Sequence, residues 1–103
     1  SLLNAYLIMD EFLKIISSEP LVLVDFYATW CQPCKMMHPV LEQLKQDMGN
    51  KIRILKVDVD KSQALAAQYR IQSVPTLMLF RNGQQAWRQS GAMPLAALKN
   101  IIG

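Results

Sequence analysis

Two cysteines that stand two residues apart, directly after an apolar run, are the feature that most constrains the fold of this sequence. Residues 21–27 form a β-branched and aromatic run typical of a strand buried on both faces, and the segment WCQPCK follows at residues 30–35. A disulfide between Cys31 and Cys34 would close so short a loop that it adds only roughly 2 kcal/mol to stability. Either thiolate, however, lies within reach of the other sulfur. The pair therefore indicates redox chemistry rather than a structural cross-link.

The composition fits a single domain over residues 1–103 that needs no cross-link to fold. The net charge is +3, but lysines and arginines are spread singly, so we expect no nucleic-acid surface. No apolar stretch is long enough for a membrane span, and we expect a monomer without membrane insertion. Two cysteines at this spacing favour a cytoplasmic redox protein, whereas a periplasmic location would require that a signal segment has been removed.

Apolar periodicity alternates between strand and helix along the chain. It predicts strands over residues 21–27, 52–59, 76–81 and 85–90, and helices over 9–16, from the cysteines to residue 49, over 62–69 and over 95–102. Asn82-Gly83 predicts a tight hairpin between the last two strands. The strand, helix, strand order around the cysteines predicts a right-handed crossover with parallel pairing, and Pro39 should kink the helix. Residues 1–8 fit either a strand or a helix.

The chemistry of three residues follows from their positions in this pattern. Cys31 would lie at a helix N-terminus, where unpaired N–H groups and the helix dipole stabilise a thiolate, so we expect it to be the attacking nucleophile. Cys34 lies one turn inside the helix, where burial would keep its thiol protonated until it resolves a mixed disulfide. Asp25 interrupts an apolar strand. Burial should raise the pKa of Asp25, and the free energy that a buried carboxyl costs favours a functional role.

Four features together resemble the thioredoxin family, namely the segments VDFYATWCQPCKMMHP, KVDVD and VPTLMLFRNG and the later Gly91. They keep the family's order and separations over residues 12–102. The resemblance implies an α/β thioredoxin fold, in which helices flank both faces of a central mixed sheet of four to five strands. It places the two cysteines at the N-terminus of the second helix and implies that no bound cofactor or metal is needed.

The resemblance also implies roles for residues outside the cysteine motif. In the family, the aspartate at Asp25 helps to take the proton from the buried cysteine, and Lys56 matches a lysine near it. A lysine that only extends to the surface is an equal alternative for Lys56. A cis peptide bond is expected before Pro75, where the substrate chain would pair with the backbone of Val74.

The same pattern outlines a docking surface around the cysteines. Trp30 is the expected exposed docking aromatic, and Gly91 would let a partner's backbone approach closely. Gln32 and Pro33 lie between the cysteines on this surface.

Five residues depart from the family pattern. Gln32 replaces a common glycine, Arg70 and Ser73 stand where glycines are frequent, and Tyr27 stands where many relatives carry tryptophan. His38 replaces a residue that is usually small, and a histidine without a role in proton transfer is the favoured interpretation of it. We expect these changes to affect the choice of partners and to leave the reaction intact.

These observations predict a protein-disulfide reductase that acts on disulfide-containing proteins and receives electrons from a thioredoxin reductase or another thiol donor. A disulfide oxidase or isomerase is the nearest alternative, and Pro33 disfavours it because oxidising relatives carry histidine there. A metal or iron–sulfur module of the same fold would have only Cys31, Cys34 and His38 as ligands, fewer than a structural zinc site uses. An adaptor that uses the fold only for docking is a third alternative.

Overall fold

Helices and strands alternate along the chain in the computed structural model, which describes residues 1–103. The helices are α1 (Leu2–Ser18), α2 (Gln32–Met48), α3 (Gln63–Gln68) and α4 (Leu95–Ile102), with a short 3-10 turn η1 (Gly49–Lys51) after α2. The strands are β1 (Leu21–Tyr27), β2 (Arg53–Asp58), β3 (Thr76–Arg81) and β4 (Gln84–Ser90). They form one sheet in the order β2-β1-β3-β4, in which β1 and β2 are parallel and the other neighbours are antiparallel. The predicted mixed sheet is confirmed.

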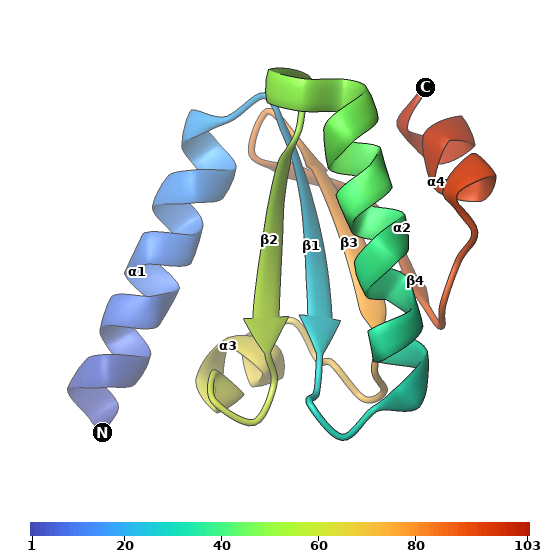
Figure 1. Cartoon of the computed structure of the whole chain (residues 1–103). Helices are drawn as coiled ribbons and strands as arrows, with labels where there is room; N and C mark the ends of the chain where they lie inside the picture. The colour runs from blue at the N-terminus through green and yellow to red at the C-terminus, as the bar shows by residue number, and fades with distance from the viewer.

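Helices cover both faces of the sheet, because successive side chains of its central strands point to opposite sides (Figure 1). Leu23 of β1 packs in a cluster with side chains of α2 and α4. Its neighbours Val22 and Val24 pack with Phe12 of α1 and Leu65 of α3. By this alternation the side chain that follows Leu23 by two residues, that of Asp25, faces the α2 layer.

The element boundaries differ from the predicted ones in a few places. Residues 2–8, which fit either strand or helix, are part of α1, and the side chain of Ser1 caps this helix by accepting a hydrogen bond from the amide of Asn4 at 3.1 Å. β2 and α3 are each one residue shorter at both ends than predicted. α2 continues through Pro39, which removes one backbone donor inside the helix.

The β3–β4 hairpin turns at Asn82 and Gly83, as predicted. Both residues have positive φ, 51° and 81°, which is the backbone that a tight hairpin turn requires. The amide of Asn82 also donates to the carbonyl of Pro20 at 2.9 Å, which ties the turn to the segment before β1. This contact holds one end of the sheet together.

The opposite end of the sheet brings the cysteine motif next to the start of β3. Because β1 and β3 are antiparallel, Phe26 near the end of β1 pairs with Thr76 at the start of β3. The segment that follows Tyr27 and the segment that precedes Thr76 therefore leave the sheet side by side. Residues separated by more than forty positions in the sequence are placed in contact in this way.

Candidate functional site

The two cysteines lie where the chain passes from β1 into α2. Cys31 is the N-cap of α2, with extended backbone, and its Sγ accepts a hydrogen bond from the amide of Cys34 at 3.2 Å. The two residues form a disulfide, with their Cα atoms 5.2 Å apart. Cys31 is 5% exposed and Cys34 is 1% exposed, so Cys31 is the one closer to the surface. The predicted placement at the start of the helix is confirmed.

The segment before β3 packs directly on the disulfide. Sγ of Cys31 lies 3.6 Å from the carbonyl oxygen of Val74, and the bond between Val74 and Pro75 is cis, as the sequence predicts. The carbonyl of Pro75 accepts a hydrogen bond from the amide of Gly91 at 2.8 Å. Gly91 has a φ of 98°, and a Cβ there would meet no atom within 4 Å. Positive φ favours glycine at this position, and the residue leaves open space beside the cis bond.

A shallow cleft of about 170 Å³ lies beside the motif and opens to the surface. It is lined by Trp30, Val59, Ile71, Gln72, Ser73 and Val74. The Trp30 side chain is 69% exposed, and its indole N–H donates to Oδ2 of Asp60 at 2.9 Å. No sequence motif indicates this role for Asp60, although it closes the KVDVD segment. The hydrogen bond fixes the orientation of an aromatic ring that would otherwise be free in solvent.

Asp25 is completely buried, and neither of its carboxylate oxygens has a hydrogen-bond partner. Burial raises the pKa of Asp25 to about 6, and the positive charge of Lys56 opposes this rise. A carboxyl with such a pKa exchanges its proton near neutral pH. This is the property that a general base needs to act at that pH, and the predicted direction of the shift is confirmed.

Lys56 lies beside Asp25 in the register of β1 and β2, but its ammonium group is bound elsewhere. Its Nζ contacts Nδ1 of His38 on α2 and lies 5.2 Å from the centre of the Tyr27 ring. Lys56 forms an ion pair neither with Asp25 nor with another carboxylate. The structure thus brings His38 to Lys56, a contact that the spacing of the sequence did not reveal.

Arg88 holds the loop between α3 and β3, and no motif in the sequence indicates this role. The guanidinium of Arg88 on β4 donates to the carbonyls of Tyr69 and Arg70, the second at 2.9 Å. Arg70 has a φ of 53°, in the left-handed region that favours glycine. The frequent glycine of the family pattern at this position is therefore explained by backbone conformation. Ser73, further along the same loop, is exposed in the wall of the cleft.

Gln32 and Pro33 occupy the first turn of α2, and both side chains are exposed. They stand between Trp30 and the buried Cys34 in the sequence, at the rim of the disulfide.

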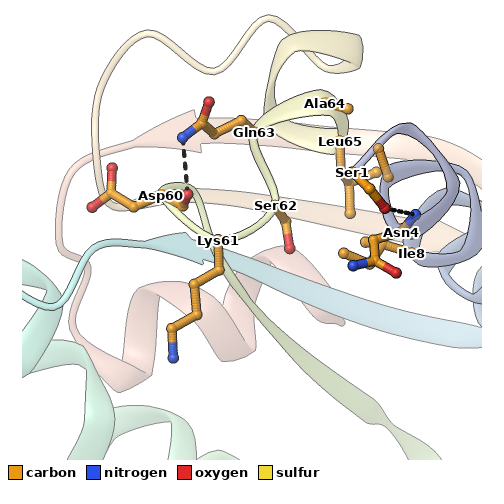
Figure 2. A pocket seen from close by; sticks show the side chains of 10 residues that line it. Ser1, Asn4, Ile8, Asp60, Lys61, Ser62, Gln63, Ala64 and Leu65 are labelled. Carbon is orange, nitrogen blue, oxygen red and sulfur yellow. Dashed lines mark hydrogen bonds between the residues drawn. The ribbon is translucent and has the colours of Figure 1, made fainter.

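The largest depression on the molecule, about 510 Å³, lies away from the disulfide, between the start of α1 and the segment that begins α3. Figure 2 shows that its drawn hydrogen bonds are local ones, from the amide of Asn4 to Ser1 and from the side chain of Gln63 to the carbonyl of Asp60. These two hydrogen bonds cap a helix and close a turn, and the carboxylate of Asp60, which also lines the depression, is bound to the indole of Trp30. We therefore place the chemistry at the smaller cleft beside Trp30 and the disulfide.

Two further properties bear on the functional classes considered above. No group of three or more histidine, cysteine, aspartate or glutamate side chains is gathered closely enough to hold a metal ion. None of the helices has the length and apolar character that crossing a membrane would require.

Comparisons with known proteins agree with this site. The thioredoxin family model matches residues 4–103. The thioredoxin of Bacillus subtilis (strain 168) is 43% identical over 93 residues, which cover 90% of this chain and 89% of the relative. A bifunctional thioredoxin reductase/thioredoxin of Mycobacterium leprae (strain TN) is 45% identical over 87 residues, which cover 84% of this chain and 19% of that protein.

The solved structures lead to the same family. Mitochondrial thioredoxin 3 from Saccharomyces cerevisiae, in its oxidised form, superposes with a TM-score of 0.83 at 39% identity, covering 91% of this chain and 88% of the other. The two proteins therefore share their fold over nearly the whole length of this chain. The chain belongs to the thioredoxin family of thiol-disulfide oxidoreductases, and it is a reductase that works by dithiol–disulfide exchange.

Proposed function

We propose that Cys31 attacks the substrate disulfide and that Cys34 resolves the complex. The thiolate of Cys31 displaces one substrate sulfur as a thiolate and forms a mixed disulfide. The thiolate of Cys34 then attacks Sγ of Cys31, releases the second substrate thiolate and leaves the disulfide seen in the structure. The observation that carries this assignment is the hydrogen bond from the amide of Cys34 to Sγ of Cys31 at the start of α2, because it favours negative charge on that sulfur.

Asp25 is proposed to take the proton from Cys34 before the second step. Its side chain faces the α2 layer, is buried, and has a pKa raised to about 6. Cys34 is almost completely buried, so water has little access to its thiol. Lys56, the neighbour of Asp25 across β1 and β2, is proposed to moderate the charge of the carboxylate during the transfer.

Protein substrates are proposed to dock on the cleft as an extended strand. The carbonyl of Val74 lies beside Sγ of Cys31, and the Pro75 segment is held by Gly91, so a short backbone edge is presented next to the reactive sulfur. Trp30 offers an exposed ring at one side of this edge. Gln32 and Pro33, both exposed, form the other contact surface.

The partners follow from the reaction and from the relatives. Disulfide-containing proteins are proposed as substrates, and a thioredoxin reductase as the electron donor, because the relative of Mycobacterium leprae is named as a bifunctional thioredoxin reductase/thioredoxin. Residues 1–103 are proposed to fold as one domain and to act as a monomer in the cytoplasm. Sedimentation of the purified protein and cell fractionation test the last two statements.

The test of the assigned roles is covalent trapping. Cys34→Ser should accumulate mixed disulfides with protein partners in a cell extract, because Cys31 can attack and nothing resolves the product. Cys31→Ser is the matched control, should trap no partner and should fail to reduce insulin disulfides. If Cys31→Ser kept its reductase activity and trapped partners, the two roles would be reversed. Metal analysis of anaerobically purified protein separates this function from a metal or iron–sulfur module.

A further inference from the structure

The side chains of Lys56, His38 and Tyr27, which come from three different elements, meet on the face of the sheet that carries Asp25. Nζ of Lys56 on β2 contacts Nδ1 of His38 on α2 and lies 5.2 Å from the centre of the Tyr27 ring on β1. The rings of Tyr27 and His38 meet edge to face with centroids 6.2 Å apart. His38 and Tyr27 are two of the five departures from the family pattern, and the structure places them on the same lysine.

The chemical groups in the contact between Lys56 and His38 determine which one donates the hydrogen bond. A lysine ammonium has three donors and no acceptor, so Nδ1 of His38 must accept the hydrogen bond and must carry no proton in this arrangement. The face of Tyr27 attracts the same cation through its ring electrons. Two independent contacts therefore hold the ammonium of Lys56 at one place.

With the ammonium of Lys56 bound in this position, the carboxylate of Asp25 has no partner. Asp25 and Lys56 are opposite each other in the parallel register of β1 and β2, so their side chains lie on the same face of adjacent strands. The flexible lysine stem can span such a distance. Yet no ion pair joins them, and both carboxylate oxygens lack a hydrogen-bond partner.

We propose that His38 is a positioning residue that binds the ammonium of Lys56 and holds it out of contact with the carboxylate of Asp25. The inference rests on the proposed role of Asp25 as the base for Cys34. A direct ion pair would favour the charged carboxylate and make it a weaker base, because an opposite charge in contact lowers the pKa of an acid. His38 thereby keeps the carboxyl in the range where it can exchange a proton near neutral pH.

The other charged groups near this contact leave His38 as the one that binds Lys56. Glu42 and Lys45 of α2 line the same shallow depression of about 200 Å³ as His38 and Lys56. Asp58, two residues after Lys56 on β2, uses its carboxylate to accept the amides of Asp60 and Lys61, as a turn cap. Asp25 is the charged side chain that β1 places on this face. The two cysteines of the α2 motif are joined in the disulfide and therefore do not titrate.

The titration of Asp25 in the oxidised protein tests the proposal directly. Carbon-13 NMR of labelled aspartate reads this titration without any thiol that could titrate with it. His38→Leu keeps the bulk of the ring and removes the acceptor, so the midpoint for Asp25 should move to lower pH by about one pH unit. In a Lys56→Met background the same His38→Leu change should leave the midpoint in place, because the cation is gone.

Two matched variants distinguish the hydrogen bond from other effects. His38→Gln offers a new acceptor and should restore most of the original midpoint, whereas Glu42→Gln removes a charge from the same depression and should not move it. A midpoint that stays in place or rises in His38→Leu would overturn the proposal. So would an equal shift in His38→Gln, or a shift in Glu42→Gln as large as that in His38→Leu.

The readout also separates this inference from the proposed function. The NMR titration does not depend on turnover, so the effect of His38 on Asp25 can be measured even if Asp25 is not the base. If Asp25→Asn left the resolution of the mixed disulfide at its original rate, the proposed role of Asp25 would fail while the titration result still stood.

Discussion

The amide of Cys34 donates a hydrogen bond to Sγ of Cys31 at 3.2 Å, and no amide is directed in the same way at the sulfur of Cys34. This relationship makes the two sulfurs unequal before any substrate arrives. One stands at the helix start, where partial positive charge gathers, and the other lies inside the first turn with almost no exposure. The order of the two proposed steps follows from this difference.

The unequal sulfurs predict unequal rates of alkylation. In the reduced protein at about pH 7, iodoacetamide should modify Cys31 at least about tenfold faster than Cys34, because only the thiolate reacts and only Cys31 is both stabilised as a thiolate and accessible. Mass spectrometry of peptides after short exposures measures both rates in one sample. Comparable rates at the two positions would remove the electrostatic argument for Cys31 as the attacker.

Gln32 is predicted to act on partners rather than on the sulfur. Its side chain is neutral and exposed at the first position of α2, so it adds no field comparable to a charge beside the thiolate. Gln32→Gly should therefore move the equilibrium with glutathione by less than about 10 mV, which is roughly a twofold change in the equilibrium constant. The same change should improve turnover by a generic thioredoxin reductase, because the partner's backbone gains room.

Redox titration and reductase kinetics check the two halves of this prediction separately. Pro33 is left unchanged in the comparison, so the start of the helix keeps its fixed backbone. If the substitution moved the redox equilibrium strongly and left reductase turnover alone, Gln32 would act on the sulfur chemistry instead.

Most of the fold could be predicted from the sequence because its elements carry strong local patterns. The unbroken run of β1 and the Asn82-Gly83 turn specify their structures with few neighbours, and both match the structure within a residue. The start of α1 could not be predicted, because residues 2–8 have exposed apolar side chains, Leu2 and Leu3 among them, without a clear period. The cap formed by Ser1 is a weak signal at the end of a chain.

The candidate site, like the fold, could be predicted from the sequence only in part. Cys31, Cys34 and Asp25 could be assigned from their place at a strand-to-helix junction and within an apolar strand. The contacts of Lys56 with His38 and of Arg88 with the loop before β3 depend on which side chains the register brings together. Neither contact has a spacing signature in the sequence, since its partners come from different elements.

The backbone at Arg70 predicts a stabilising substitution. Arg70 has a φ of 53°, a conformation that costs a residue with a Cβ about 1 kcal/mol and costs glycine almost nothing. Arg70→Gly should therefore raise the free energy of unfolding by about that amount. Arg70→Ala is the control, because it removes the same side chain and keeps the strained backbone. Urea denaturation of both variants decides the question, and equal midpoints for the glycine and alanine variants would refute the backbone explanation.

Buried Asp25 predicts a stability that falls as pH rises. Its pKa is raised from 3.8 to about 6 by burial, so folding favours the protonated carboxyl. The resulting stabilisation is fully present below about pH 4 and is lost as the pH rises through 6, since the folded state then holds an unfavourable charge. A shift of about two pH units corresponds to about 3 kcal/mol. The neutral variant Asp25→Asn lacks this dependence.

The measurement is urea unfolding of the oxidised wild-type protein and of Asp25→Asn at about pH 4, 6 and 8. The variant should gain stability relative to wild type as the pH rises, by up to about 3 kcal/mol between the first and last conditions. The comparison across pH cancels the constant effect of burying an amide at position 25, which makes the difference specific to the carboxyl charge. Using the disulfide form keeps Cys31 and Cys34 from titrating in the same range. Parallel pH profiles for the two proteins would mean that Asp25 has the same proton affinity folded and unfolded, and the basis for its role as a base near neutral pH would be lost.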